Sequence, residues 1–312
     1  MIIALFSFFI SLAVVIFGAK LLLAASISLS RFLRLPEMVV GATLVSLITT
    51  MPENLVSIFA SVSAHRGLAL GDVVGSGLVN LGLIFGIVLL AGHGQGEKEG
   101  RGRRRSLILF CLVLLISLWL LIFGKIGSYG GAALILAAFV FLGYTFWYTL
   151  KESGESLKII EIKLETHPKV IFKFFLGALL LILGARFLVS SGVSLAQILG
   201  LPEILIGITL VAVGTSLPEL ATALTALFSG HEKLSLGNLT GATVLTFTLA
   251  LGLVAVISGV EAGEEKLKID FLALLLFSGL TLVFAHFPKL PQRILGGILV
   301  ISYFCYLGYL FL

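Results

Sequence analysis

Long apolar stretches recur along this whole chain, and they leave few folds open to it. Runs of roughly 18 or more apolar residues are long enough to cross a bilayer as α-helices. Helices suit this environment because all their backbone hydrogen bonds are made within the segment. Charged residues make up 12% of the sequence, about half the share typical of soluble domains. The sequence therefore predicts an all-α polytopic membrane protein with ten transmembrane helices, over residues 3–25, 37–64, 68–91, 106–124, 128–149, 170–192, 203–229, 234–259, 269–287 and 291–311.

The chain also repeats itself. Shifting the sequence by 166 residues brings similar residues into coincidence without a gap, as in Pro52-Glu53 with Pro218-Glu219. Each half then holds five spans, and an odd number of spans turns the second half upside down in the membrane. We expect a first five-helix repeat over residues 1–150, a cytoplasmic linker over 151–169, and a second, inverted five-helix repeat over 170–312.

Loop charge predicts the orientation in the membrane. Most of the 21 Lys and Arg residues lie in loops that reach the cytoplasm only if the N-terminus is outside. Because positive loops stay inside, we expect a multi-pass protein of the cell membrane with its N-terminus outside.

Two glutamates lie deep in expected spans, within the matching motifs Thr49-Thr50-Met51-Pro52-Glu53 and Thr215-Ser216-Leu217-Pro218-Glu219. An acidic residue at a helix centre costs roughly 2.5–3.5 kcal/mol on insertion scales, so its presence indicates function. The two prolines have no N–H, so the carbonyls four residues earlier lose their helical partners. Such carbonyls and carboxylates are ligands for Ca²⁺ or Na⁺. The alternatives are salt bridges of the glutamates to Lys20 or Arg186, and simple proline kinks.

Helical spacing gathers further oxygen atoms around these motifs. Thr49 and Glu53 are four residues apart and share a helix face, as do Thr215 and Glu219. Ser76 and Asn80 have the same spacing in the next span, and their counterparts in the second half are Ala242 and Thr246. No His or Cys cluster lies within the spans, which argues against a Zn²⁺ or Cu⁺ carrier and against a resident cofactor. We expect Asp72 and Asp270, near the ends of spans, to lie within reach of water.

Both halves resemble the cation/Ca²⁺ antiporter superfamily, and they are most similar to its prokaryotic Na⁺/Ca²⁺ exchanger branch. The two proline–glutamate motifs resemble the α-repeats of that superfamily. The segments Gly71-Asp72-Val73-Val74-Gly75-Ser76 and Gly237-Asn238-Leu239-Thr240-Gly241-Ala242 resemble the motifs of its third and eighth helices. The resemblance implies ten helices, with the second, third, seventh and eighth building the site and the first and sixth sliding across it.

The resemblance also assigns roles by position. It implies that Glu53 and Glu219 bind Ca²⁺ together with the carbonyls of Thr49 and Thr215. Asn80 would point into the middle of the site. An inner Na⁺ position would be lined by Thr50, Ser76 and the carbonyl of Ser46. An outer Na⁺ position would be lined by Thr215, Ser216 and the carbonyl of Ala212.

Two positions depart from the exchanger pattern. Thr246 stands where that branch usually has Asp, and Ala242 stands where it usually has Ser. These losses predict that Na⁺ binding is weakened more than Ca²⁺ binding, with fewer Na⁺ ions or with protons as the counter-ion. The alternative function is therefore an antiporter that exchanges H⁺ or another cation for Ca²⁺.

Other classes of membrane protein are less well supported by the sequence. A cation channel could use acidic side chains, but it would need a continuous pore. A membrane enzyme is disfavoured because no His-Glu-x-x-His, Gly-x-Ser-x-Gly or paired-Asp motif is present. The expected partners are Ca²⁺, Na⁺ and the lipid bilayer, with no nucleic acid and no obligate protein partner.

Overall fold

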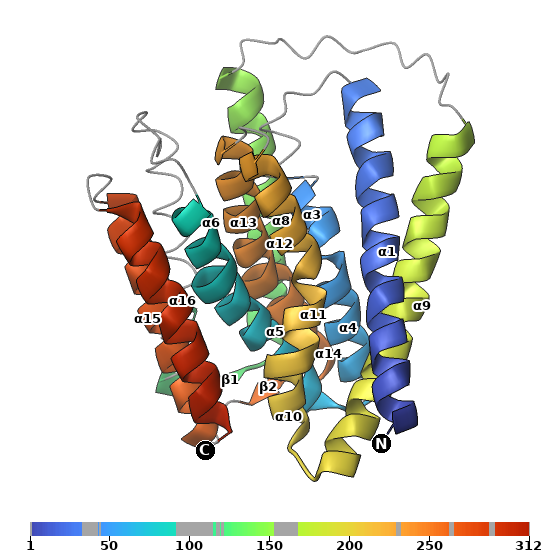
Figure 1. Cartoon of the computed structure of the whole chain (residues 1–312), viewed down its shortest axis with the longest axis vertical. Helices are drawn as coiled ribbons and strands as arrows, with labels where there is room; N and C mark the ends of the chain where they lie inside the picture. The colour runs from blue at the N-terminus through green and yellow to red at the C-terminus, as the bar shows by residue number, and fades with distance from the viewer. Residues whose placement is uncertain are drawn as a thin grey trace.

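The computed structural model describes residues 2–32, 43, 45–91, 115, 116, 119, 122–152, 168–228, 232–261, 265–286 and 291–311 as a bundle of helices (Figure 1). In the first half these are α1 (Ile2–Phe32), α3 (Ser46–Thr49), α4 (Met51–Val62), α5 (Arg66–Leu78), the π-helix η2 (Val79–Ile84), α6 (Phe85–Ala91) and α8 (Ser128–Glu152). In the second half they are α9 (Pro168–Leu199), α10 (Glu203–Ile206), the π-helix η3 (Gly207–Val211), α11 (Ala212–Thr215), α12 (Leu217–Phe228), α13 (Glu232–Leu245), the π-helix η4 (Thr246–Ala250), α14 (Leu251–Ile257), α15 (Glu265–His286) and α16 (Gln292–Leu310).

Seven helical stretches within the described residues are long and apolar enough to cross a membrane. They coincide with seven of the predicted spans, although α9 extends seven residues beyond the predicted end at residue 192. The predicted span over residues 106–124 lies mostly outside the described residues. The chain is thus an all-helical, multi-pass membrane protein, as its composition predicts.

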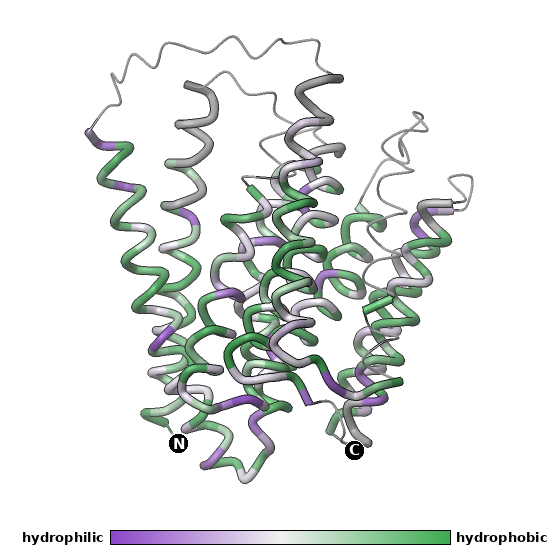
Figure 2. Tube along the Cα trace, turned by 180° about the vertical axis from the view of Figure 1, so that it is seen from behind, coloured by the Kyte–Doolittle hydropathy of each residue, from purple (hydrophilic) through white to green (hydrophobic). Residues whose placement is uncertain are grey.

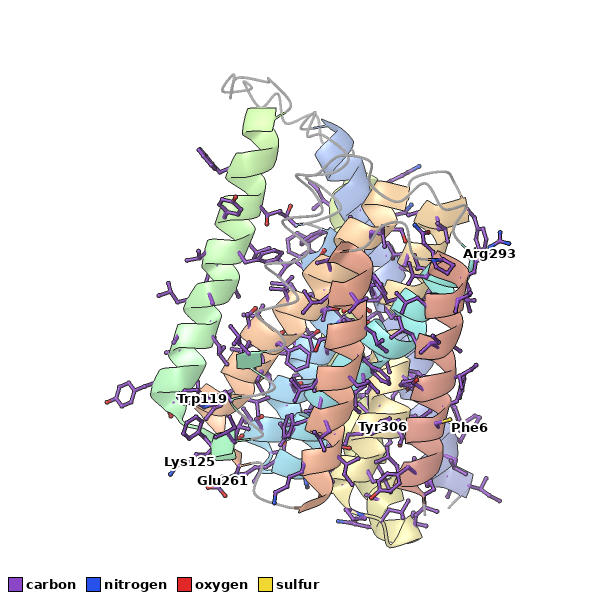
Figure 3. All side chains as sticks on the ribbon, turned by 90° about the vertical axis from the view of Figure 1, so that its left-hand side faces the viewer. Phe6, Trp119, Lys125, Glu261, Arg293 and Tyr306 are labelled. Atoms are coloured by element: carbon purple, nitrogen blue, oxygen red, sulfur yellow. The ribbon has the colours of Figure 1, made fainter. Side chains whose placement is uncertain are left out.

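The helices of the two halves have matching boundaries. Shifting by 166 residues carries α3 onto α11, α4 onto α12 and α6 onto α14 with identical ends. Helices α1 and α9, which the same shift brings together, run in opposite directions: α1 rises from the N-terminus in Figure 1, whereas α9 descends beside it. In Figure 3, α8 starts beside Lys125 at the lower end of the molecule and α16 starts beside Arg293 at the upper end.

The distribution of polarity is that of a membrane protein. Large apolar side chains on the outer helices are exposed, including Phe6 on α1, Phe139 on α8, Phe175 on α9 and Ile301 on α16. Figure 2 shows these long helices as mostly hydrophobic, with hydrophilic positions inside the bundle and towards both of its ends. Lipid covers an apolar exterior at no cost, whereas the buried polar groups must find partners inside the protein.

Helices α1 and α9 pack along each other through two equivalent glycines. A Cβ atom added to Gly18 would lie 2.8 Å from the backbone nitrogen of Leu181. One added to Gly184 would lie 3.0 Å from the backbone nitrogen of Val15. Glycine at these positions lets the two backbones approach closely, as small residues do at membrane helix interfaces.

Two further contacts join the halves at the lower end of the bundle. The short strands β1 (Lys125–Ile126) and β2 (Val260–Glu261) pair antiparallel, with Lys125 opposite Glu261 (Figure 3). Nearby, the Nδ1 atom of His65 lies 2.9 Å from Oε1 of Glu203, and both side chains are partly exposed. His65 therefore lies at the start of α5, and it pairs with the other half of the chain.

Candidate ion-binding site

Two broken helices carry the glutamate motifs. Between α3 and α4, the N–H of Thr50 donates to the Ser46 carbonyl at 3.0 Å, and the turn is followed by Pro52 in the first turn of α4. Between α11 and α12, Ser216 makes the same bond to the Ala212 carbonyl at 3.1 Å. Each proline lacks the N–H that would continue the preceding helix, and proline suits the first turn of the next.

The breaks put each glutamate at a helix start. Glu53 lies in the first turn of α4, and Glu219 lies in the first turn of α12. The positive end of the helix dipole stabilises an anionic side chain at such a position.

The two glutamates come together in the core of the protein. Both side chains are fully buried, and their charges are close enough to interact. Lys20 and Arg186 are exposed, and no ion pair to either glutamate is found in the described part of the chain. The salt-bridge alternative raised by the sequence is therefore wrong.

Hydrogen bonding to the glutamates is sparse. Ser216 Oγ donates to Oε1 of Glu53 at 3.2 Å, and Oε2 of Glu53 has no hydrogen bond. Thr49 faces Glu219, but its hydroxyl bonds to the Ser46 carbonyl at 3.2 Å, and neither carboxyl oxygen of Glu219 has a hydrogen bond of good geometry. Buried polar atoms are nearly always paired, so these oxygens are free to bind a ligand.

All the predicted site residues are buried, with none more than 1% exposed. They are Ser46, Thr49, Thr50, Glu53, Ser76, Asn80, Ala212, Thr215, Ser216, Glu219 and Thr246. Thr50 donates to the Ser46 carbonyl at 2.9 Å, and Thr246 donates to the Ala242 carbonyl at 3.0 Å. The hydroxyl of Ser76 and both polar atoms of the Asn80 side chain have no hydrogen-bond partner.

Asn80 and Thr246 occupy equivalent positions in irregular helix. Asn80 lies in η2, and Thr246 begins η4. Single π turns within α-helices occur frequently at functional sites because they reorient side chains locally. No feature of the sequence indicated these π turns.

A third acid, Asp72, lies in the same region. Its side chain is 0% exposed, and it interacts electrostatically with both glutamates. Ser57 donates to its Oδ2 atom at 2.9 Å, and Thr215 donates to Oδ1 at 3.1 Å. The prediction that water reaches Asp72 is therefore wrong. The sequence did contain a sign that Asp72 belongs to this region, because Asp72 lies in the motif from Gly71 to Ser76. Its counterpart in the second half is Asn238.

The same prediction is wrong for Asp270. This side chain is 3% exposed and accepts a 2.6 Å hydrogen bond from the Tyr306 hydroxyl. The pair joins α15 to α16. The prediction failed because a position near the end of a span suggested contact with water, whereas Asp270 is buried and bonded to Tyr306 of α16.

Close backbone packing holds Asp72 in place. A Cβ atom on Gly75 would lie 2.6 Å from the Ile208 carbonyl oxygen, and one on Gly207 would lie 2.7 Å from the Leu68 carbonyl oxygen and 3.0 Å from the Asp72 nitrogen. Helix α5 of the first half therefore lies directly against η3 of the second. This contact brings Asp72 to Thr215.

The donor set consists of oxygen atoms from many kinds of group. Among the described residues, no three His, Cys, Asp or Glu side chains converge closely enough to hold a metal ion by themselves. A cation here would therefore depend on hydroxyl, amide and carbonyl oxygens in addition to carboxylates. Such mixed oxygen sets suit Ca²⁺ and other hard cations.

The fold and the buried site together define a helical multi-pass membrane protein with an acidic, oxygen-rich interior. The chain belongs to the sodium/calcium exchanger protein family, whose model matches residues 3–147 and 169–312. The resemblance noted in the sequence is thereby confirmed. The family is one of exchangers and not of enzymes.

Individual relatives agree with this assignment. The inner membrane protein YrbG of Escherichia coli strain K12 is 30% identical, over 97% of this chain and 95% of YrbG. The sodium/calcium exchanger MaX1 of Methanosarcina acetivorans is 28% identical over 94% of each chain. A structure of the sodium-calcium exchanger NCX_Mj soaked with Na⁺ and Sr²⁺ superposes with a TM-score of 0.72 at 24% identity, over 98% of both chains. At that identity the last comparison supports the fold alone.

Proposed function

We propose that this protein is a secondary active antiporter that exchanges Ca²⁺ for Na⁺ by alternating access at a site built on Glu53 and Glu219. One observation carries the proposal: two fully buried glutamates from the two halves interact with each other, and no basic partner to either is found in the described part of the chain. Two uncompensated charges in a dry core are costly. A transported cation would remove that cost.

The proposed architecture is ten transmembrane helices in two inverted five-helix repeats, residues 1–150 and 170–312, joined by a cytoplasmic linker over 151–169. The identical helix boundaries under the 166-residue shift and the opposite directions of α1 and α9 support it. The N-terminus would lie outside the cell membrane, as the loop charges predict.

The proposed ligands follow the sequence motifs. Glu53 and Glu219 would bind Ca²⁺ together with the carbonyls of Thr49 and Thr215, with Asn80 nearby. The inner Na⁺ position would comprise Thr50, Ser76 and the Ser46 carbonyl. The outer one would comprise Thr215, Ser216 and the Ala212 carbonyl. The burial of these residues and the unpaired atoms of Glu53, Glu219, Ser76 and Asn80 support these roles.

Competition for the same carboxylates would couple the two fluxes. Ca²⁺ neutralises both glutamates, and Na⁺ ions displace it by occupying the same oxygens and the flanking hydroxyls. An empty site would carry bare charges, so only a loaded carrier would switch between inward and outward access. Helices α1 and α9, which meet through Gly18 and Gly184, would slide across the site as a gate.

An H⁺/Ca²⁺ antiporter is the second candidate. The observation that favours it is the hydrogen bond of Thr246, whose hydroxyl donates to the Ala242 carbonyl. Exchangers of this branch usually carry an acidic side chain at position 246 and a hydroxyl side chain at position 242. Weak Na⁺ ligands at this position would leave protons on Glu53 and Glu219 as the counter-ion.

Flux of ⁴⁵Ca²⁺ in proteoliposomes, with Na⁺, K⁺ and pH gradients varied one at a time, tests the proposal. A Na⁺ gradient should drive Ca²⁺ uptake, and Glu53→Gln or Glu219→Gln should abolish it. Glu203→Gln is the matched control, because Glu203 is partly exposed and pairs with His65 outside the site. Uptake driven only by a pH gradient would establish the second candidate instead. Full activity of either site variant would refute the glutamate site.

A further inference from the structure

Asp72 is a buried carboxylate to which the proposed exchange cycle gives no role. It is 0% exposed, and its two oxygens each accept a hydrogen bond, from Ser57 of its own half and Thr215 of the other. Two donors on two different oxygens fit an ionised carboxylate, which can only accept. A buried anion whose neighbours are two hydroxyls and two further acids is costly unless a positive charge lies nearby.

Oxygen atoms gather on the Thr215 side of this carboxylate. The hydroxyl of Thr215 lies 3.1 Å from Asp72 Oδ1, 3.1 Å from the Val211 carbonyl and 3.3 Å from the Ala212 carbonyl. Three oxygens, one each from α5, η3 and α11, therefore lie within hydrogen-bonding distance of the Thr215 hydroxyl. Carboxylate and carbonyl oxygens are ligands that hard metal cations take.

An independent feature also points to a ligand beside Asp72. Glu219 interacts electrostatically with Asp72, is fully buried, and has no well-formed hydrogen bond on either carboxyl oxygen. Ser76, one helical turn beyond Asp72 on α5, is also buried with an unpaired hydroxyl. Glu219 and Ser76 thus leave buried oxygen atoms near Asp72 without hydrogen bonds.

The two halves of the chain differ in polarity around Asp72. Ser57, Asp72 and Ser76 of the first half are replaced at the equivalent positions of the second half by Ala223, Asn238 and Ala242. The first half thus supplies the carboxylate, and Thr215 of the second half donates a hydrogen bond to it. The asymmetry gives one of the two pseudo-equivalent positions a negative charge that the other does not have.

We infer that Asp72 is a third anionic ligand of the transport site, where it binds a Na⁺ ion together with Thr215 and the carbonyls of Val211 and Ala212. The inference rests on the proposed exchange function, and it gives a role in that function to Asp72, which the proposed ligand set does not include. It revises the prediction that Na⁺ binding is weakened, because a carboxylate on α5 replaces the oxygens missing at Ala242 and Thr246.

The charge balance gives a measurable consequence. When Glu53, Asp72 and Glu219 are ionised, the site carries three negative charges. One Ca²⁺ neutralises two of these charges, whereas Na⁺ ions can neutralise all three. Asp72→Asn removes one of the three charges and should remove one Na⁺ from each exchange cycle. At zero membrane potential and a tenfold Na⁺ gradient, the equilibrium Ca²⁺ accumulation ratio should then fall by about tenfold, since each coupled ion contributes one factor of the gradient.

The test uses the full-length chain in liposomes with the potential clamped by K⁺ and valinomycin. Two quantities are measured: Ca²⁺/Ca²⁺ exchange without Na⁺, and Ca²⁺ accumulation at a fixed Na⁺ gradient. Asp72→Asn should lower the second by a larger factor than the first. Asp270→Asn is the matched control, because it removes a buried carboxylate that bonds Tyr306 and none of the proposed site residues, and it should preserve both. Ser57→Ala keeps the Asp72 charge and should preserve the accumulation ratio.

The outcomes separate the two proposals. Wild-type protein without Na⁺-driven uptake would refute the exchange function itself. Normal wild-type exchange with an unchanged accumulation ratio in Asp72→Asn would refute only the role of Asp72. Loss of Ca²⁺/Ca²⁺ exchange in Asp72→Asn, with Ser57→Ala intact, would also overturn the Na⁺ assignment. A change in pH dependence without a change in Na⁺ coupling would identify the ligand as a proton and overturn it as well.

Discussion

Gly207→Ala tests whether close packing of the two halves builds the site. The added methyl carbon would lie 2.7 Å from the Leu68 carbonyl oxygen, 3.0 Å from the Asp72 nitrogen and 3.0 Å from the Gly71 Cα atom. Ordinary contacts of this kind are 3.4–4 Å, so α5 and η3 must separate by several tenths of an ångström. All three neighbours are backbone atoms, and no side-chain rotation can relieve the clash.

The expected cost follows from overpacking, which destabilises cores by about 1–3 kcal/mol. The same separation would stretch the 3.1 Å hydrogen bond from Thr215 to Asp72 towards the limit of hydrogen bonding. The variant should therefore show both a lower apparent melting temperature in detergent and weaker Na⁺-driven Ca²⁺ uptake.

Gly143→Ala on α8 is the matched control. No heavy atom lies within 4 Å of a Cβ atom at that position, so a methyl group there meets open space. Its melting temperature and its uptake should match those of the wild type. If Gly207→Ala melts at the wild-type temperature and transports normally, the close contact does not hold Asp72 in place.

Two further variants test the hydrogen bonding and the gate. Ser216→Ala removes the 3.2 Å hydrogen bond to Glu53, which should raise the half-saturating Ca²⁺ concentration by about fivefold, the equivalent of about 1 kcal/mol. Ser194→Ala, which loses only a bond within its own helix, should not raise it, and an equal effect of both would refute the role of Ser216. Gly18→Val should slow Ca²⁺ exchange without weakening equilibrium binding, because the side chain would obstruct sliding of α1 on α9, whereas Gly308→Val meets open space. Wild-type exchange rates in Gly18→Val would contradict the sliding gate.

Much of the fold could be predicted from the chain alone, because the responsible forces are local. Apolar runs of sufficient length must become helices in a bilayer, and the 166-residue repeat predicted equivalent helices that the structure bounds identically. Pro52 and Pro218 predicted the helix breaks, since a missing N–H acts on its own helix wherever that helix lies. The burial of Glu53 and Glu219 could be predicted for a similar reason, because depth in a span follows from position in the sequence.

Asp72 could not be located this way, because its environment is made by another part of the chain. Its place near the end of a span suggested water, but η3 covers it once glycines at 71, 75 and 207 allow the backbones to touch. The helical periodicity of α5 records which residues share a face, yet it contains no information about which helix that face meets. Asp270 and its bond to Tyr306 are decided in the same way. Tertiary packing across the two halves thus decides which acidic groups are dry, while the local sequence decides only where they lie along their helices.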